Sequence, residues 1–162
     1  MTTAPGPVVV ALLADHERLI AAVGEMRWQE WGQPPEPDDQ AWWVNVTARE
    51  AGRDQLPITW VAIDQRGNAI GAVGLAPYDL EERQDRSPWL IGMIVRADRR
   101  GAGIGGRLVA QLENWAGAHG YTRVWVATGG RAVDFYRKCG WGIYETIERA
   151  AGDVTTVLTK AL

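Results

Sequence analysis

The sequence predicts a single domain of the α/β (α+β) class, in which about four helices cover a mixed sheet of about six to seven strands. Two observations predict this class. The chain has 162 residues and 46% hydrophobic content, which suits one domain with a substantial core. Short apolar or alternating segments are interleaved with segments of helical periodicity, without an internal repeat or a low-complexity tract. We therefore expect one domain over residues 1–162.

Residues 1–56 are expected to form an N-terminal strand and two helices. Val8–Leu13 is apolar enough for a strand, and residues 15–31 carry apolar side chains at helical spacing. A proline-broken acidic connector, GQPPEPDD, follows. Asp38 or Asp39 at its end can cap the second helix.

Residues 57–128 are expected to hold the central strands. Pro57–Asp64 and Ala69–Ala76 flank the turn sequence QRGN, which predicts a β-hairpin. The polar segment PYDLEERQDRS then predicts a surface loop before a buried strand at Trp89–Val95. Tyr121–Thr128 is the next strand. Because a helix connects it to Trp89–Val95, we expect these two strands to be parallel.

Residues 129–162 are expected to form a short C-terminal helix and a closing antiparallel pair of strands. The two strands are predicted at Trp141–Arg149 and Val154–Leu162. The helix has one apolar side, formed by Ala132, Phe135, Tyr136 and Cys139.

The composition excludes several classes of function. A net charge of −3 and a pI near 5.4 argue against a general nucleic-acid or membrane binder, which needs concentrated positive charge. Cys139 is the only cysteine, so there is no internal disulfide, and with two distant histidines it cannot form an ordinary zinc site. The apolar run PVVVALLA is too short to span a bilayer. We expect a cytoplasmic, metal-independent protein, and its nine tryptophans are compatible with a homodimer.

The segment RADRRGAGIGG predicts an anion site. It lies between the strand at Trp89–Val95 and an amphipathic helix that begins within the glycines. A helix N-terminus presents unpaired backbone N–H groups, and glycines let phosphates approach them closely. Arg99 and Arg100 add positive charge, so the segment is expected to bind a diphosphate.

Two common phosphate-binding templates do not fit this segment. Gly101, Gly103 and Gly106 match the dinucleotide pattern G-x-G-x-x-G. Dinucleotide-binding folds carry an acidic residue that binds the ribose about twenty positions after this motif, but no Asp or Glu lies between Asn114 and Val133. About sixty residues follow the motif, too few for a second nucleotide half and a substrate domain. An NAD-dependent oxidoreductase is therefore a remote alternative. A P-loop is excluded because its terminal Gly-Lys-Ser/Thr is missing.

The third template is Arg/Gln-x-x-Gly-x-Gly/Ala after a strand, which Arg100–Gly105 matches. Here the chain resembles the GCN5-related N-acetyltransferase (GNAT) superfamily, in which this loop holds the pyrophosphate of acetyl-CoA. The segment AVDFYRKCGW resembles the second signature of the family. Order and spacing agree over about Pro88–Trp141, and the flanking elements fit the family's architecture.

The resemblance implies a parallel pair of strands that separate at the cofactor site, where Gly92 can form a bulge. It implies that backbone groups of the central strand bind the pantetheine and that loop N–H groups bind the diphosphate. The implied acetyl-CoA residues are Met93, Ile94, Val95, Arg100, Gly101, Ala102, Gly103, Ile104, Gly105 and Gly106. One departure is Thr128–Gly129–Gly130, where many members carry an asparagine, so a cofactor contact is lost or replaced there.

The resemblance also implies direct acetyl transfer to an amine. Tyr136 matches the tyrosine that protonates the departing CoA thiolate in many members, although its spacing alone is also that of a core aromatic. Cys139 has no candidate base nearby in the sequence and is expected to be a packing residue.

The general base and the acceptor are less defined. The central strand WLIGMIV has no carboxylate, so the candidate bases are Glu30, Asp79, Glu81 and Glu82. Trp28 and Trp31, close to several carboxylates, suit a cationic acceptor amine: an aminoglycoside-like compound, a polyamine or a peptide N-terminus. A catalytically degenerate acetyl-CoA sensor or interaction module is the alternative function.

Overall fold

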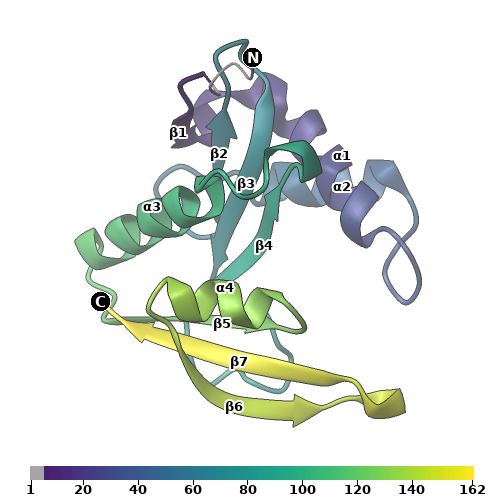
Figure 1. Ribbon diagram of the computed structural model, residues 1–162, viewed down its shortest axis with the longest axis vertical. Coiled ribbons are helices and arrows are strands. Elements are labelled where there is room, and N and C mark those ends of the chain that lie inside the picture. Colours follow the sequence, from purple (N-terminus) through teal and green to yellow (C-terminus); the bar gives the residue numbers. More distant parts are fainter. Residues whose placement is uncertain (1–5) are drawn as a thin grey trace.

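The computed structural model describes residues 6–162 and contains a seven-stranded mixed sheet with four α-helices (Figure 1). The strands are β1 (Val9–Leu12), β2 (Ile58–Ile63), β3 (Ala69–Ala76), β4 (Trp89–Val95), β5 (Arg123–Thr128), β6 (Gly142–Glu148) and β7 (Val154–Ala161). The helices are α1 (Ile20–Trp31), α2 (Gln40–Arg49), α3 (Ile104–Ala118) and α4 (Ala132–Lys138). The predicted fold class is confirmed.

The sheet order is β1-β2-β3-β4-β5-β7-β6. Strands β1 to β4 are antiparallel neighbours, which confirms the hairpin predicted for β2 and β3. Strands β4 and β5 are parallel, as expected from the connecting helix α3. The closing pair β6 and β7 is antiparallel, and β7 lies between β5 and β6. β6 is therefore an edge strand, which the sequence pattern does not specify.

The core lies on both faces of the sheet. On one face, α3 and α4 pack over the central strands through Leu108, Leu112 and Tyr136. On the other face, Leu13 and Val23 pack against β2, β3 and β4. Each face thus receives alternate residues of β2, which explains why that strand is fully buried and is apolar at every position except Thr59.

The first helix begins later than the sequence predicts. The periodicity predicts a helix over residues 15–31, but α1 begins at Ile20. Two short 3₁₀ turns, Leu13–Asp15 and Glu17–Leu19, precede it. They are separated by His16, whose backbone (φ −135°, ψ 55°) is not helical. The apolar residues of this segment still reach the core because the 3₁₀ turns place Leu13 and Leu19 on the same side of the sheet.

Strands β4 and β5 separate after two residue pairs. Only Trp89–Trp125 and Leu90–Val126 are in register between them. Strand β4 also carries a bulge, because its register with β3 pairs Ile91 with Gly74 but Ile94 with Ala72. Gly92 in this bulge has φ +56°, a conformation that favours glycine. The second half of β4 therefore presents an unpaired backbone edge toward the space beside β5.

Candidate active site

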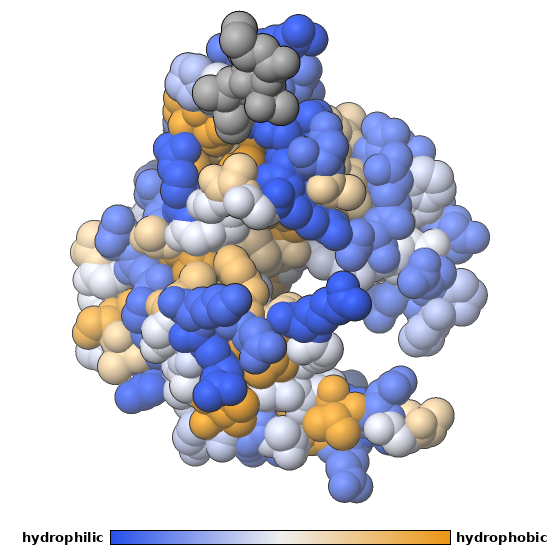
Figure 2. All heavy atoms as spheres, viewed as in Figure 1, coloured by the Kyte–Doolittle hydropathy of each residue, from blue (hydrophilic) through white to orange (hydrophobic). Residues whose placement is uncertain are grey.

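The space between the separating strands is a cavity of about 940 Å³. Its walls come from β4, from the glycine loop and the start of α3, from the end of β5, and from α4. Glu30 and Trp31 of α1 and Asp79 of the loop before β4 complete the lining. Figure 2 shows a hollow on this face, between the part that carries α1 and α2 and the part that carries α4 and β6. The cavity brings together residues that are distant in the sequence.

The glycine loop forms one end of the cavity and fits an anionic group. Gly101 and Gly103 have φ of +84° and +81°, so the chain turns sharply into α3, which begins at Ile104. A Cβ atom at either glycine would meet nothing within 4 Å and both residues are exposed, so a ligand can approach the loop closely. Arg99 and Arg131 also line the cavity. A helix N-terminus, an open loop and arginines together suit a diphosphate.

Most of the predicted cofactor residues lie on the cavity wall. From β4 these are Met93, Ile94 and Val95, and from the loop and α3 they are Arg100, Gly101, Gly103, Ile104, Gly105 and Gly106. Ala102 is exposed and does not line the cavity. Thr128 and Gly129, at the position of the missing family asparagine, line it as well.

Arg100 folds back onto the protein. Its Nε donates a hydrogen bond to the carbonyl of Val95 at 2.9 Å, and its Nη2 lies 3.3 Å from the carboxylate of Glu30. Glu30 therefore lines the cavity as the ion-pair partner of Arg100. This pair connects α1 to the loop that precedes α3.

Tyr136 lines the cavity and is 3% exposed. Its ring packs against Phe135 and Trp141, with ring centroids 5.0 and 5.5 Å away. Burial, and to a lesser extent Cys139, raises the pKa of Tyr136. The phenol therefore stays protonated at neutral pH and is available as a proton donor. Tyr136 is thus both a core aromatic and a cavity residue.

Asp79 is the predicted base whose surroundings are most unusual. Asp79 is exposed to water, and it lies in the cavity wall, where neighbouring protein atoms replace part of its solvent. The resulting loss of solvation raises the pKa of Asp79 to about 6, and the negative charge of Glu50 contributes to the same shift. A carboxyl group with a pKa near 6 is partly deprotonated near neutrality and basic enough to accept a proton.

The other two candidate bases do not line the cavity. Glu81 is exposed on the loop before β4. Glu82 accepts two hydrogen bonds of 2.9 Å from Arg149, which lower the pKa of its carboxyl group. A carboxylate held in this way is a weak base, so the geometry favours Asp79 over both.

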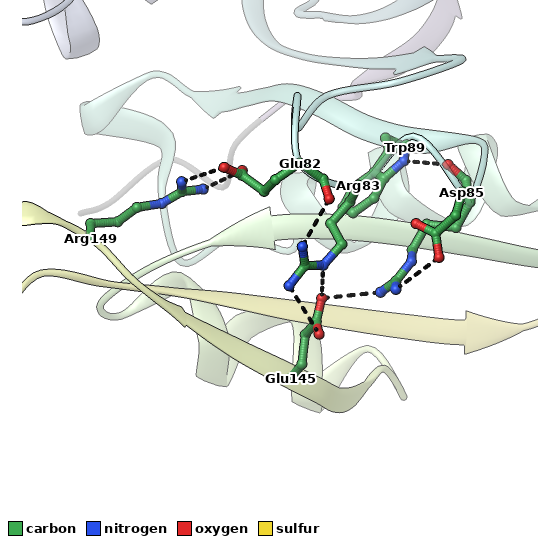
Figure 3. A network of polar contacts seen from close by, with 7 residues as sticks. Glu82, Arg83, Asp85, Trp89, Glu145 and Arg149 are labelled. Carbon is green, nitrogen blue, oxygen red and sulfur yellow. Dashed lines mark hydrogen bonds and ion pairs between the residues drawn. The ribbon is translucent and has the colours of Figure 1, made fainter.

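A network of ion pairs holds the loop before β4 against the C-terminal strands (Figure 3). Arg83 and Arg86 both bond to Glu145 of β6, and Glu82 bonds to Arg149. The guanidinium of Arg86 also lies 4.8 Å from the ring centroid of Trp125. These contacts join segments about sixty residues apart, and they fix the loop that carries Asp79 at the cavity.

The two predicted acceptor residues differ in position. Trp28 is half-buried, its Nε1 has no hydrogen-bond partner within the described residues, and it does not line the cavity. Trp31 lines the cavity and also a second hollow of about 280 Å³. That hollow is lined further by Gln33, Pro34, Pro35, Glu36 and Trp43. The Trp31 and Trp43 rings pack together, with centroids 6.2 Å apart.

Two polar residues next to the site were not predicted. Arg27 of α1 is 2% exposed and forms an ion pair of 3.0 Å with Glu50, which directly follows α2. Burial lowers the pKa of Arg27 and raises that of Glu50. A sequence signal for Arg27 exists, because it lies four residues after Val23 and so falls on the apolar face of α1. The sequence contains no comparable pattern that would identify Glu50 as its partner.

Other chemistries find little support in the described residues. Cys139 packs against the core cluster, its thiol pKa is raised by burial, and it does not line the cavity. Across residues 6–162, no group of three His, Cys, Asp or Glu side chains is arranged to hold a metal ion. No helix in that range is both long enough and apolar enough to cross a membrane.

Comparison with solved structures places this fold among the acetyltransferases. An aminoglycoside 6′-N-acetyltransferase in complex with coenzyme A superposes with a TM-score of 0.77 at 16% identity, covering 94% of this chain and 96% of that one. The aminoglycoside 6′-N-acetyltransferase from Enterococcus faecium gives 0.75 at 18% identity, with the same coverage. A spermidine N-acetyltransferase chimera from Vibrio cholerae and hSSAT gives 0.67 at 14% identity, covering 95% of each chain. At these identities the likeness establishes the fold.

The fold and the cavity fit an acetyl-CoA-dependent acetyltransferase. The open loop glycines, the start of α3 and the nearby arginines are the features that fit the diphosphate of acetyl-CoA. Residues 19–141 match the description "Acetyltransferase (GNAT) family", and the chain belongs to that family. The sequence matches no curated protein.

Proposed function

We propose that the protein transfers an acetyl group directly from acetyl-CoA to a primary amine that is cationic in water. The observation that carries this proposal is the lining of one cavity by the glycine loop, the unpaired edge of β4, Tyr136 and Asp79. A donor site, a proton donor and a proton acceptor thus open on the same space. Direct transfer needs this combination.

Each group has a distinct task in the reaction. Acetyl-CoA supplies a thioester carbonyl that an unprotonated amine can attack. Asp79 takes the proton that the ammonium must lose, directly or through one water molecule. A backbone N–H of β4, at Met93 or Ile94, stabilises the negative charge on the carbonyl oxygen. When the carbon–sulfur bond breaks, Tyr136 donates its proton to the CoA sulfur. The nitrogen keeps the acetyl group and releases its second proton, and Tyr136 regains a proton from water.

The acceptor is inferred from the charge beside the cavity. From Trp28 to Ala48 the chain carries four acidic residues and no Lys or Arg. Trp31 lies between the main cavity and the hollow that contains Glu36 and Trp43. Aromatic faces and carboxylates both attract ammonium groups. These features support a small amine with more than one positive charge, of the aminoglycoside or polyamine kind, over a peptide N-terminus.

Two measurements test the proposal. Acetyl-CoA should raise the melting temperature, and NAD should not, because only a ligand that binds the native state stabilises it. A panel of mono- and polycationic amines should then release free CoA thiol, fastest with the polycationic ones. Stabilisation by acetyl-CoA without thiol release for any amine would favour a sensor or interaction module. Stabilisation by NAD alone would favour an oxidoreductase.

A further inference from the structure

Arg27 connects three elements beside the active site. Its Nη1 donates hydrogen bonds to Thr47 Oγ1 at 3.2 Å and to the Glu50 carboxylate at 3.0 Å. Its Nε donates to the carbonyl oxygen of Gly92 at 3.3 Å, in the bulge of β4. One buried side chain of α1 is therefore bound both to the end of α2 and to the strand that forms the cavity wall.

Stability alone does not account for this arrangement. Burying an ion pair costs about as much solvation energy as the pair returns, and apolar residues of similar size often serve as well. Arg27 is 2% exposed, and its Nη2 has no hydrogen-bond partner among the described residues, which adds to the cost. The position of the guanidinium against β4 offers a functional reason for keeping it.

The guanidinium occupies the place where a side chain of residue 92 would lie. A Cβ atom at Gly92 would be 2.6 Å from Nη2 of Arg27, closer than real contacts allow. The registers of β4 with its neighbours pair neither Gly92 nor Met93 in the described part of the chain. Arg27 therefore binds a peptide group that lies outside the regular strand register.

The planarity of this peptide links Arg27 to the reaction. In a trans peptide the C=O of Gly92 and the N–H of Met93 point in opposite directions. A donor that fixes the carbonyl on the α1 side therefore also fixes the direction of the N–H. Both residues line the cavity, so this N–H is one that can face the thioester.

We propose that Arg27 is a positioning residue for acetyl transfer: it holds the Gly92 carbonyl and thereby turns the Met93 N–H toward the thioester oxygen of bound acetyl-CoA. The inference rests on the proposed function. When the amine nitrogen bonds to the carbonyl carbon, the oxygen gains the electron pair of the C=O bond, and the Met93 N–H stabilises that charge. The oxygen returns the pair as the carbon–sulfur bond breaks. Arg27 itself touches no reacting atom.

The test is the substitution Arg27→Lys, which keeps the positive charge but lacks the Nε donor. With saturating amine, kcat should fall by about 10²- to 10³-fold, the effect of losing one oxyanion donor. The affinity for acetyl-CoA should change only slightly, because the loop that holds the diphosphate is intact and one hydrogen bond to the thioester is lost. In the binary complex with ¹³C-carbonyl acetyl-CoA, the infrared carbonyl stretch should move to higher frequency than in the wild type, since the hydrogen bond that weakens the C=O bond is lost.

The matched control is Arg18→Lys. Arg18 also donates to a glycine carbonyl, that of Gly67 at 3.0 Å, but at an exposed site outside the cavity lining. Neither kcat nor the carbonyl frequency should change. If Arg27→Lys does not fold, the double variant Arg27→Met/Glu50→Leu removes both charges and is expected to fold. It should show the same frequency shift.

An unchanged carbonyl frequency in a folded Arg27 variant would overturn the inference, and so would a wild-type kcat for Arg27→Lys. Failure of the proposed function looks different. In that case the wild-type protein itself would bind no acetyl-CoA or would transfer acetyl to no amine. The frequency is read without an amine, so it separates the role of Arg27 from the identity of the acceptor.

Discussion

Replacement of Asp79 by asparagine tests the assignment of the base. Asparagine has nearly the same shape but cannot accept the proton of the ammonium group. Loss of a general base lowers rates by about 10²- to 10⁴-fold, so kcat/KM for the amine should fall within that range. Asp85→Asn is the matched control. Asp85 belongs to the same loop and is held by Arg86 outside the cavity lining, so its substitution should leave kcat/KM unchanged.

The pKa of Asp79 sets how strongly the activity should depend on pH. Asp79 has a pKa of about 6, raised by the surrounding protein and by Glu50. Its carboxylate can therefore accept a proton above pH 6, and this capacity is lost as the pH falls through 6. At pH 5 only about one molecule in eleven carries the charged carboxylate. An unperturbed aspartate, with a pKa of about 4, would remain about nine-tenths charged at pH 5.

The assay is kcat/KM for the amine between pH 4.5 and about 8, followed by free-thiol release. The acceptor amine also titrates, but it does so equally for both proteins. The ratio of wild-type to Asp79→Asn activity should therefore rise about tenfold from pH 5 to pH 7 and then level off. A flat ratio, or an Asp79→Asn variant with wild-type activity, would refute the assignment of Asp79 as the base.

Three further predictions follow from the same geometry. Glu50→Gln removes a negative charge near the base and lowers its pKa, so the rise of kcat/KM should begin at a lower pH; an unmoved profile would contradict this coupling. Tyr136→Phe should lower kcat about 10²-fold or more where chemistry limits turnover, with little change in melting temperature; unchanged turnover would remove Tyr136 as the acid. Gly92→Ala should lower the free energy of unfolding by about 1–3 kcal/mol in urea, because the new methyl group meets Arg27 and alanine is strained at a positive φ. The control Gly117→Ala, on the open face of α3, should instead raise the free energy of unfolding.

The local part of the structure could be predicted from the sequence. The strand β4, the glycine loop and α3 follow from short-range signals: a buried apolar run, glycines in a basic loop and an apolar stripe at helical spacing. The parallel pairing of β4 and β5 follows from the crossover rule. These signals lie within about forty residues of one another, and together they predict the cofactor end of the candidate site.

The catalytic base could only be narrowed to four carboxylates. Whether a carboxylate is a base depends on what faces it, and those partners are distant in the sequence. Glu82 is occupied by Arg149, and Asp79 is influenced by Glu50. Arg27 shows the same limit. Its place on an apolar helix face is visible in the sequence, but its contact with Gly92 of β4 depends on the packing of α1 against the sheet.

Local sequence patterns also do not predict which of the two closing strands pairs with β5. The alternation of β6 and β7 predicts an antiparallel pair, but either strand could have been placed next to β5. The structure places β7 there, where its central residues Val157 and Leu158 are fully buried, and leaves the largely exposed β6 at the edge. Burial of the more apolar strand is the physical reason for this order.

A single-turnover experiment tests direct acetyl transfer within this cavity most directly. Enzyme in excess is mixed with acetyl-CoA and a polycationic amine, quenched at successive times, and the masses of the protein and of the amine are followed. If transfer is direct, acetyl-amine appears together with free CoA while the protein, including Cys139, keeps its mass throughout. An acetylated protein that forms before the product, or CoA release that no amine accelerates, would contradict direct transfer.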